Sequence, residues 1–185
     1  MLVGQAPASP LRSKGRPFSG QAGRVLFGWL ARSGFSEDEF RARCYFTAIT
    51  KCYPGPARPP ASPPTPEGGA SGEGASPPFS PLGPGSGKGD RVPTSQERAL
   101  CLPYLLRELA LIQPTLILTV GRISASYFLG NTIDFTQIIG HSFERDGRTI
   151  LPLPHPSGVS RWTNLPANQA RLEHALSLLK EMTHD

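Results

Sequence analysis

The sequence has few cysteines and no long apolar run. Three cysteines in 185 residues are a poor basis for a disulfide framework, so we expect a reducing, cytoplasmic setting. No apolar run approaches the roughly 18–20 residues that a membrane helix needs. The start, Met1 to Gln5, has neither the basic nor the apolar region of a signal peptide. These features argue against a disulfide-rich secreted protein and against a membrane protein.

Proline and glycine are abundant but unevenly spread. Residues 54–93 hold 12 Pro and 9 Gly, with three basic and three acidic side chains. We expect this stretch to be a disordered Pro/Gly-rich insertion, and residues 1–53 and 94–185 to form a single domain. The formal net charge of +5 therefore belongs to the folded part, which permits an anionic partner such as nucleic acid.

Hydrophobic periodicity predicts strands that alternate with helices. We expect helices over Gly20 to Gly34, over Ile123 to Leu129 and from about Pro166 onward. A further helix begins at the capping-box pattern Thr94 to Glu97, and Pro103 is expected to kink or restart it. Expected strands are a short one at Leu2–Val3, a buried one over Cys44–Thr50, and two more over Thr115–Gly121 and Thr149–Leu153. This alternation predicts a three-layer α/β/α fold with a central, mainly parallel sheet.

Two loops that follow predicted strands carry side chains suited to binding. In the first loop, Phe18 lies among glycines, where its ring could stack on a flat ligand or pack into the core. In the second, His155 could stabilise negative charge and Ser157 could hold a phosphate. Trp162 could stack on a base or anchor the last helix. Because ligands bind at the carboxyl ends of parallel strands, both loops are expected at that edge.

Together these segments resemble the uracil-DNA glycosylase superfamily, and most closely its bacterial iron–sulfur branches, families 4 and 5. The similar motifs are Gly4-Gln-Ala-Pro-Ala8, Gly15-Arg-Pro-Phe-Ser-Gly-Gln-Ala-Gly23, Lys51-Cys-Tyr-Pro54, Cys101-Leu-Pro-Tyr-Leu105, Leu116-Ile-Leu-Thr-Val-Gly121 and His155-Pro-Ser157. Their order covers essentially the whole chain outside the Pro/Gly-rich stretch. The resemblance implies a monomeric enzyme of the bacterial cytosol or nucleoid that flips uracil out of DNA and hydrolyses its N-glycosidic bond.

The resemblance also assigns roles to residues. His155 would donate a hydrogen bond to the departing uracil, Phe18 would stack on the flipped base, and Gln5 would help to position water. Gly4, Ala6, Pro7 and Ala48 would line the base pocket, and Ser157 would grip a flanking phosphate. Val159, Arg161 or Trp162 would fill or brace the gap left in the duplex.

The sequence departs from the family pattern at the water-positioning loop and at the uracil-reading position. Gln5 and Ala6 replace the acidic residues of related loops, so we expect slow turnover. Ala48 stands where family 4 has a uracil-reading Asn, which should relax selectivity toward other deaminated bases. These changes keep a second hypothesis open, a catalytically weak or inactive relative that binds DNA and senses damage.

The cluster pattern is incomplete as well. Family 4 binds a 4Fe-4S cluster with four cysteines, of which Cys52 and Cys101 match the downstream pair. Either the upstream pair precedes Met1 in an N-terminally longer protein, which is the alternative we expect, or the cluster has been lost. We expect Cys44 to be a core thiol.

Overall fold

The computed structural model describes residues 1–9, 15–57, 90–131, 134–156 and 162–183. Five strands form one sheet in the order β2-β1-β3-β5-β4, with all neighbours parallel except the antiparallel pair β4 and β5. The strands are β1 (Leu2–Gly4), β2 (Phe46–Ala48), β3 (Leu116–Val120), β4 (Phe143–Arg145) and β5 (Arg148–Leu153). The predicted α/β fold with a mainly parallel sheet is therefore confirmed.

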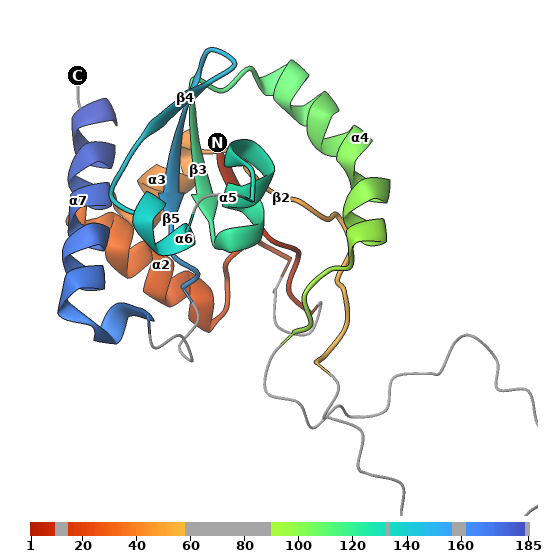
Figure 1. Ribbon diagram of the computed structural model, residues 1–185, viewed down its shortest axis with the longest axis horizontal. Helices are drawn as coiled ribbons and strands as arrows, with labels where there is room; N and C mark the ends of the chain where they lie inside the picture. The colour runs from red at the N-terminus through yellow and green to blue at the C-terminus, as the bar shows by residue number, and fades with distance from the viewer. Residues whose placement is uncertain (10–14, 58–89, 132–133, 157–161, 184–185) are drawn as a thin grey trace, which may run out of the picture.

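Helices lie on both faces of this sheet (Figure 1). They are α2 (Gln21–Arg32), α3 (Glu37–Arg43), α4 (Ser95–Ile112), α5 (Arg122–Leu129), α6 (Phe135–Ile138) and α7 (Pro166–Thr183), with a 3-10 turn η1 (Trp162–Asn164) before α7. Of the helices that the structure describes, none is long and apolar enough to cross a membrane.

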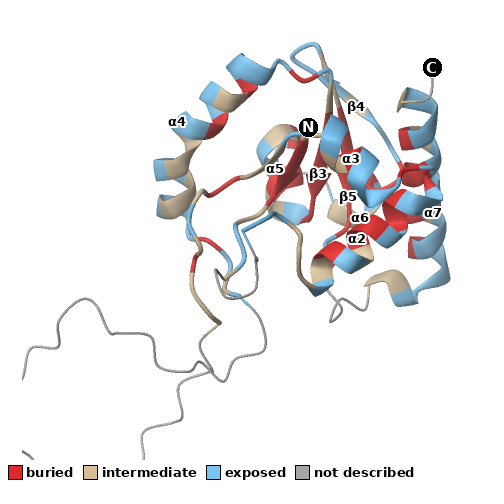
Figure 2. Ribbon diagram, turned by 180° about the vertical axis from the view of Figure 1, so that it is seen from behind, coloured by how far each residue is buried: buried red, intermediate tan, exposed pale blue. Residues whose placement is uncertain are grey.

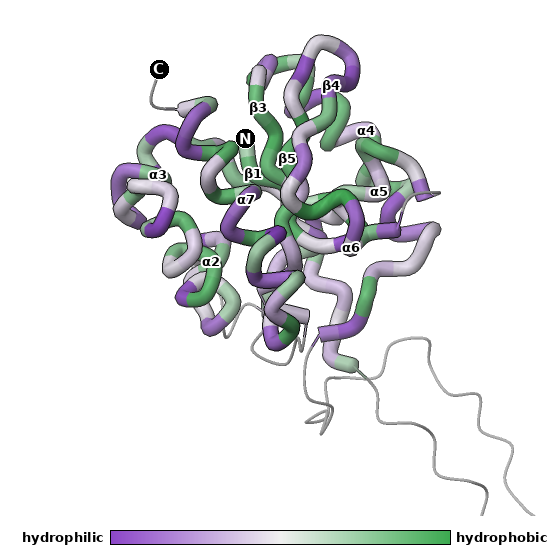
Figure 3. Tube along the Cα trace, turned by 60° about the vertical axis from the view of Figure 1, so that its left-hand side comes forward, coloured by the Kyte–Doolittle hydropathy of each residue, from purple (hydrophilic) through white to green (hydrophobic). Residues whose placement is uncertain are grey.

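Alternating strand residues separate two hydrophobic cores. Leu2, Leu118 and Leu151 face α2, α3 and α7, while Val3, Ile117 and Ile150 face α4, α5 and α6. Figure 2 shows the burial concentrated in β3 and β5 and on the inner sides of the helices, and Figure 3 shows β3 as largely apolar. Burial on both faces explains why the β3 sequence is a continuous apolar run.

Helix α4 begins at the predicted capping box and continues through Pro103. The capping box is present, with the Glu97 N–H donating to Thr94 Oγ1 and the Glu97 carboxylate accepting from the Thr94 N–H. The helix then runs through Pro103 without a restart. Pro103 and Ala99 are both exposed, so water can reach the Ala99 carbonyl that loses its helical partner. Within α4, burial is limited to Leu105 and Leu109.

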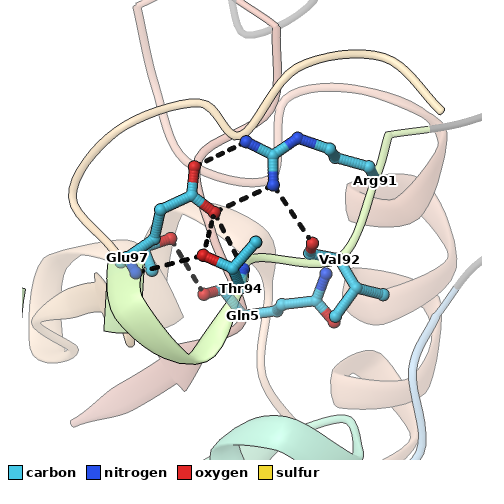
Figure 4. Close-up of polar contacts among 6 residues, drawn as sticks. Gln5, Arg91, Val92, Thr94 and Glu97 are labelled. Carbon is cyan, nitrogen blue, oxygen red and sulfur yellow. Dashed lines mark hydrogen bonds and ion pairs between the residues drawn. The ribbon is translucent and has the colours of Figure 1, made fainter. Parts of the chain in front are cut away.

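The chain on either side of residues 58–89 is closed by backbone pairing. Pro56 and Asp90 form an antiparallel bridge, and the Arg91 N–H donates to the Gly55 carbonyl (3.0 Å). The Tyr53 hydroxyl donates to Asp90 Oδ1 (3.1 Å). We call these two paired segments, Tyr53 to Pro56 and Asp90 to Arg91, the neck. Arg91 also forms an ion pair with Glu97 at the start of α4 (Figure 4), which fixes the neck to that helix.

Candidate active site

Four strand ends and the loops that follow them meet at one edge of the sheet. Strands β1, β2, β3 and β5 are parallel, so their carboxyl ends lie side by side, and Gly4 is in register with Ala48. Gly121 follows β3, and its N–H donates to the Leu153 carbonyl at the end of β5 (2.9 Å), two residues before His155. This edge is where parallel α/β proteins bind their ligands.

The loop after β1 is tied to the segment after β2. The Gly4 carbonyl accepts from the Ile49 N–H (3.0 Å), and the Gln5 carbonyl accepts from both the backbone N–H (3.2 Å) and the hydroxyl (3.5 Å) of Thr50. Gln5 and Ala6 are half-buried, whereas Pro7 is exposed. Figure 4 shows Gln5 together with the residues that begin α4. The backbone of this loop is therefore held on a rigid support.

Phe18 lies directly over the end of β1. A Cβ atom built on Gly4 would lie 3.3 Å from Phe18 Cζ, so the missing side chain of Gly4 leaves space for the ring. The ring also contacts Phe46 of β2, with centroids 6.3 Å apart, and it remains half-buried. The ring therefore packs against the core, which was one of the two alternatives for Phe18, and its half-buried position also places it at the candidate site.

His155 stands at the same edge, beside Gly121. A Cβ atom built on Gly121 would lie 3.2 Å from His155 Cδ2, so the absence of a side chain at Gly121 allows the imidazole to pack there. The imidazole remains solvent-accessible, but the surrounding protein atoms desolvate it and lower its pKa below the ordinary 6.5. The neutral form therefore predominates at pH 7. A neutral imidazole can donate a hydrogen bond to an oxygen that gains negative charge.

The remaining predicted positions differ in their surroundings. The Ala48 carbonyl accepts from Lys51 Nζ (2.9 Å), and Ala48 is paired in register with Gly4. The Trp162 indole packs against the core and donates to Thr136 Oγ1 (3.3 Å), as expected of an anchor for α7. Ser157, Val159 and Arg161 lie outside the described residues.

Comparisons with known proteins agree with this arrangement. The sequence model of the Uracil DNA glycosylase superfamily matches residues 1–180. The chain belongs to this superfamily. It is 26% identical over 163 residues to the type-4 uracil-DNA glycosylase of Thermotoga maritima, covering 87% of this chain and 66% of the relative. The type-4 enzymes of Archaeoglobus fulgidus (29% over 168 residues, 86% and 65%) and Pyrobaculum aerophilum (30% over 125 residues, 68% and 45%) are also similar.

This uracil-DNA glycosylase superfamily member spans two thirds or less of the length of those curated relatives. The match nevertheless covers every segment that forms the edge described above, from β1 to the loop after β5. Family membership and the parallel α/β fold thus follow from the comparisons and the structure together.

The two cysteines assigned to a cluster lie close together. The Lys51 N–H donates to Cys101 Sγ (3.3 Å), which brings that thiol to the residue next to Cys52. Cys52 is exposed and Cys101 is half-buried, and the Lys51 ammonium is paired with Glu108 (2.6 Å) on the same helix as Cys101. N–H donation to sulfur is a feature of iron–sulfur sites. The pair fits half of a four-cysteine set, and the described part of the chain holds no group of three ligating side chains.

Cys44 lies away from that pair, half-buried against the core of α2, α3 and α7. Burial raises the pKa of its thiol, which keeps the thiol protonated and unreactive at neutral pH. Cys44 thus packs against the core as a small apolar side chain would, in agreement with the expectation of a core thiol.

Two contributors to the site were absent from the sequence prediction. Thr50 holds the Gln5 carbonyl, and Arg41 binds the loop that carries Phe18. Thr50 is the last residue of the strand predicted over Cys44–Thr50, and a polar side chain at the end of such a strand is a usable signal for it. Arg41 has none, because its role depends on how α3 packs beside that loop.

Proposed function

We propose that this protein is a DNA-repair glycosylase that removes uracil, or a related deaminated base, flipped out of DNA. The observation that carries the proposal is that Phe18 and a neutral His155, which are distant in sequence, flank the carboxyl ends of β1 and β3. A flat ring and a neutral hydrogen-bond donor are what a flipped base and its departing oxygen require. The membership of the chain in the superfamily supports the same reading.

In the proposed reaction, the bond between N1 of uracil and C1′ of deoxyribose breaks heterolytically. The electron pair leaves with the base, whose O2 gains negative charge, while the sugar becomes an oxocarbenium ion. A donor such as His155 at that oxygen is worth on the order of 10²- to 10³-fold in rate. Water then adds to C1′ and loses a proton to solvent, the uracil anion takes up a proton from solvent, and the products are an abasic site and free uracil.

Gln5 and Ala6 offer no carboxylate to activate this water. The loop backbone, fixed by Thr50, would orient the water instead, so the rate would depend mainly on stabilisation of the leaving base. At Ala48, a methyl group replaces the amide that would read uracil. We therefore propose that hypoxanthine and xanthine are accepted as well as uracil.

Ser157 would bind a phosphate beside the flipped nucleotide, and Val159 and Arg161 would occupy the gap in the duplex; Trp162 would brace that segment from the core. Cys52 and Cys101 would hold two corners of a 4Fe-4S cluster, which would tie the segment after β2 to α4 and take no part in bond cleavage. We further propose that the protein acts as a monomer in the bacterial cytosol.

A strand-scission assay tests the enzymatic proposal. Labelled single- and double-stranded oligonucleotides that contain uracil, hypoxanthine or xanthine are incubated with the protein and treated with alkali. We expect breaks at the modified base that disappear in His155→Ala and persist in His174→Ala, an exposed histidine of α7.

A catalytically weak damage sensor is the second candidate, favoured by Gln5, Ala6 and Ala48. Tight, salt-sensitive binding to uracil-containing DNA without breaks would establish the sensor in place of the enzyme. If the protein neither cleaves nor binds such DNA, both the enzyme and the sensor proposals are wrong.

The cluster proposal has its own readout. Protein purified anaerobically after expression from its complete reading frame, with any residues that precede Met1, should show the broad visible absorption of an iron–sulfur centre, lost in Cys52→Ala and kept in Cys44→Ala. A colourless wild-type protein would contradict the proposal without bearing on base excision.

A further inference from the structure

Phe18 adopts a backbone conformation that a phenylalanine rarely takes without support. Its φ is +53°, in the left-handed region, where the Cβ atom of a non-glycine residue comes too close to the backbone. Such strain persists where the surroundings determine the conformation, and it is often found at functional sites. The contacts that hold the Phe18 backbone therefore also set where its ring lies.

One support is the close approach of α2. A Cβ atom built on Gly23 would lie 1.6 Å from the Phe18 carbonyl oxygen, so only glycine leaves space for that carbonyl. This contact permits the conformation but does not fix it, because it contributes no hydrogen bond. A directional contact is needed as well.

Arg41 of α3 supplies that contact. Its Nη1 donates to the Pro17 carbonyl (3.0 Å) and its Nη2 to the Phe18 carbonyl (3.3 Å). Nε is bound to Glu37 Oε1 (2.8 Å), so all three nitrogens of the guanidinium make hydrogen bonds. A planar guanidinium can hold two carbonyls at once in this way, which a lysine cannot reproduce.

The guanidinium is itself locked in place. Its carbon lies 4.4 Å from the centroid of the Phe27 ring and 5.4 Å from that of Phe46, and only 14% of the side chain is exposed. Phe46 is also the ring that Phe18 contacts. Arg41 therefore joins the loop backbone to the same aromatic cluster on which the Phe18 ring rests.

We infer that Arg41 is a positioning residue that sets the plane of the Phe18 ring over Gly4, and so prepares the surface on which a flipped base would stack. The effect on catalysis rests on the proposed function, whereas the claim that Arg41 holds the Phe18 loop in place does not. Arg41 touches neither base nor sugar in this scheme and acts only through the Phe18 loop.

The test compares Arg41→Met with Arg43→Met. Methionine keeps a long apolar stem for the packing on the phenyl rings but cannot donate to the carbonyls. Arg43 is the matched control, because it lies on the same helix, pairs with Glu39 (3.8 Å) and stacks on Phe35 (5.7 Å), yet makes no hydrogen bond to residues 15–20, the part of the loop around Phe18 that the structure describes.

The first readout is independent of activity. Limited chymotrypsin digestion, followed by mass spectrometry, measures cleavage of the bond between Phe18 and Ser19. Loss of hydrogen bonds from a charged donor should speed this cleavage by about tenfold in Arg41→Met and leave Arg43→Met at the wild-type rate. Equal rates in all three proteins would overturn the positioning role, whether or not the protein excises bases.

The second readout is a double-mutant cycle on kcat/KM for uracil excision. Arg41→Met should lower kcat/KM by about 10- to 100-fold, and Phe18→Ala by a similar factor. If Arg41 acts through Phe18, the double variant is no slower than Phe18→Ala alone. Additive losses would refute the inference, whereas an inactive wild-type protein would refute the proposed function and leave the cleavage result to decide on Arg41.

Discussion

Replacing the glycine at each end of α5 isolates the contact between Gly121 and His155. Gly121 has φ 88° and ψ 166°, and Gly130 has φ 86° and ψ 172°. Both conformations belong to a region used essentially by glycine alone, and alanine there costs about 1–3 kcal/mol. Gly121→Ala and Gly130→Ala should therefore lower the free energy of unfolding by similar amounts.

The two variants differ in what the new methyl group meets. At residue 121 it would lie 3.2 Å from His155 Cδ2 and 3.5 Å from His155 Cβ, whereas at residue 130 nothing lies within 4 Å. Ordinary carbon contacts are about 3.5–4.0 Å, so the imidazole must move by roughly 0.3–0.8 Å. A shift of that size at a reacting group should lower kcat/KM by about tenfold.

Urea denaturation and single-turnover uracil excision together test this reasoning. We expect comparable destabilisation in both variants, a loss of activity in Gly121→Ala, and wild-type activity in Gly130→Ala. If both variants lose activity equally, the effect comes from backbone strain in α5. If neither loses activity, the position of His155 against Gly121 has no bearing on the reaction.

Further predictions concern pH and the neck. Burial lowers the pKa of His155 below 6.5, and the neutral form is the donor. As pH falls, kcat/KM should therefore reach half of its plateau value only below pH 6.5, and His155→Asn should lack this drop; a wild-type midpoint above pH 6.5 would contradict the assignment. Hydrogen bonds from Arg91 and Thr94 lower the pKa of Glu97 to about 2 from an ordinary 4.5. The ionised Glu97 carboxylate therefore stabilises the folded state fully above pH 4.5, and this contribution fades toward pH 2. The gap in Tm between wild type and Glu97→Gln should therefore shrink over that interval, and a gap that stays constant would be inconsistent with this shift. Replacing residues 58–89 with a short Gly/Ser linker should leave activity intact and raise stability by roughly 1–2 kcal/mol in urea denaturation, because a shorter loop costs less entropy to close; loss of the folded state would refute the single-domain prediction.

Much of the fold follows from local sequence patterns. Leu26, Trp29 and Leu30 recur at helical spacing and are buried in α2, and the continuous apolar run of β3 marks a strand covered on both faces. The alternation of such segments predicts the parallel sheet. It also predicts that the loops carrying Phe18 and His155 share one edge, although their roles in chemistry remain predictions.

Other parts depend on tertiary context. The segment Cys44–Thr50 is rich in β-formers, yet β2 is a three-residue edge strand of half-buried residues rather than a buried strand. Strand β4 was not predicted because Glu144 and Arg145 are exposed. The turn Asp146-Gly147, with both residues at positive φ, is a hairpin signal that could have indicated it.

Helix α4 shows how little of an apolar helix face can be covered. The helix continues through the exposed Pro103, so of the two alternatives for this proline the restart is excluded. Leu106 and Ile112 are apolar, yet they are 52% and 43% exposed because the helix meets the core through Leu105 and Leu109. Periodicity indicates a helix without showing how much of its apolar face the neighbouring layer covers.

The most direct test is the rate at which uracil is released from a single-stranded oligonucleotide under single-turnover conditions. The account predicts release by the wild-type protein and a loss on the order of 10²- to 10³-fold in His155→Ala. Wild-type protein that leaves the glycosidic bond intact, or a His155→Ala variant as fast as wild type, would contradict the assignment of this edge of the sheet as the catalytic site.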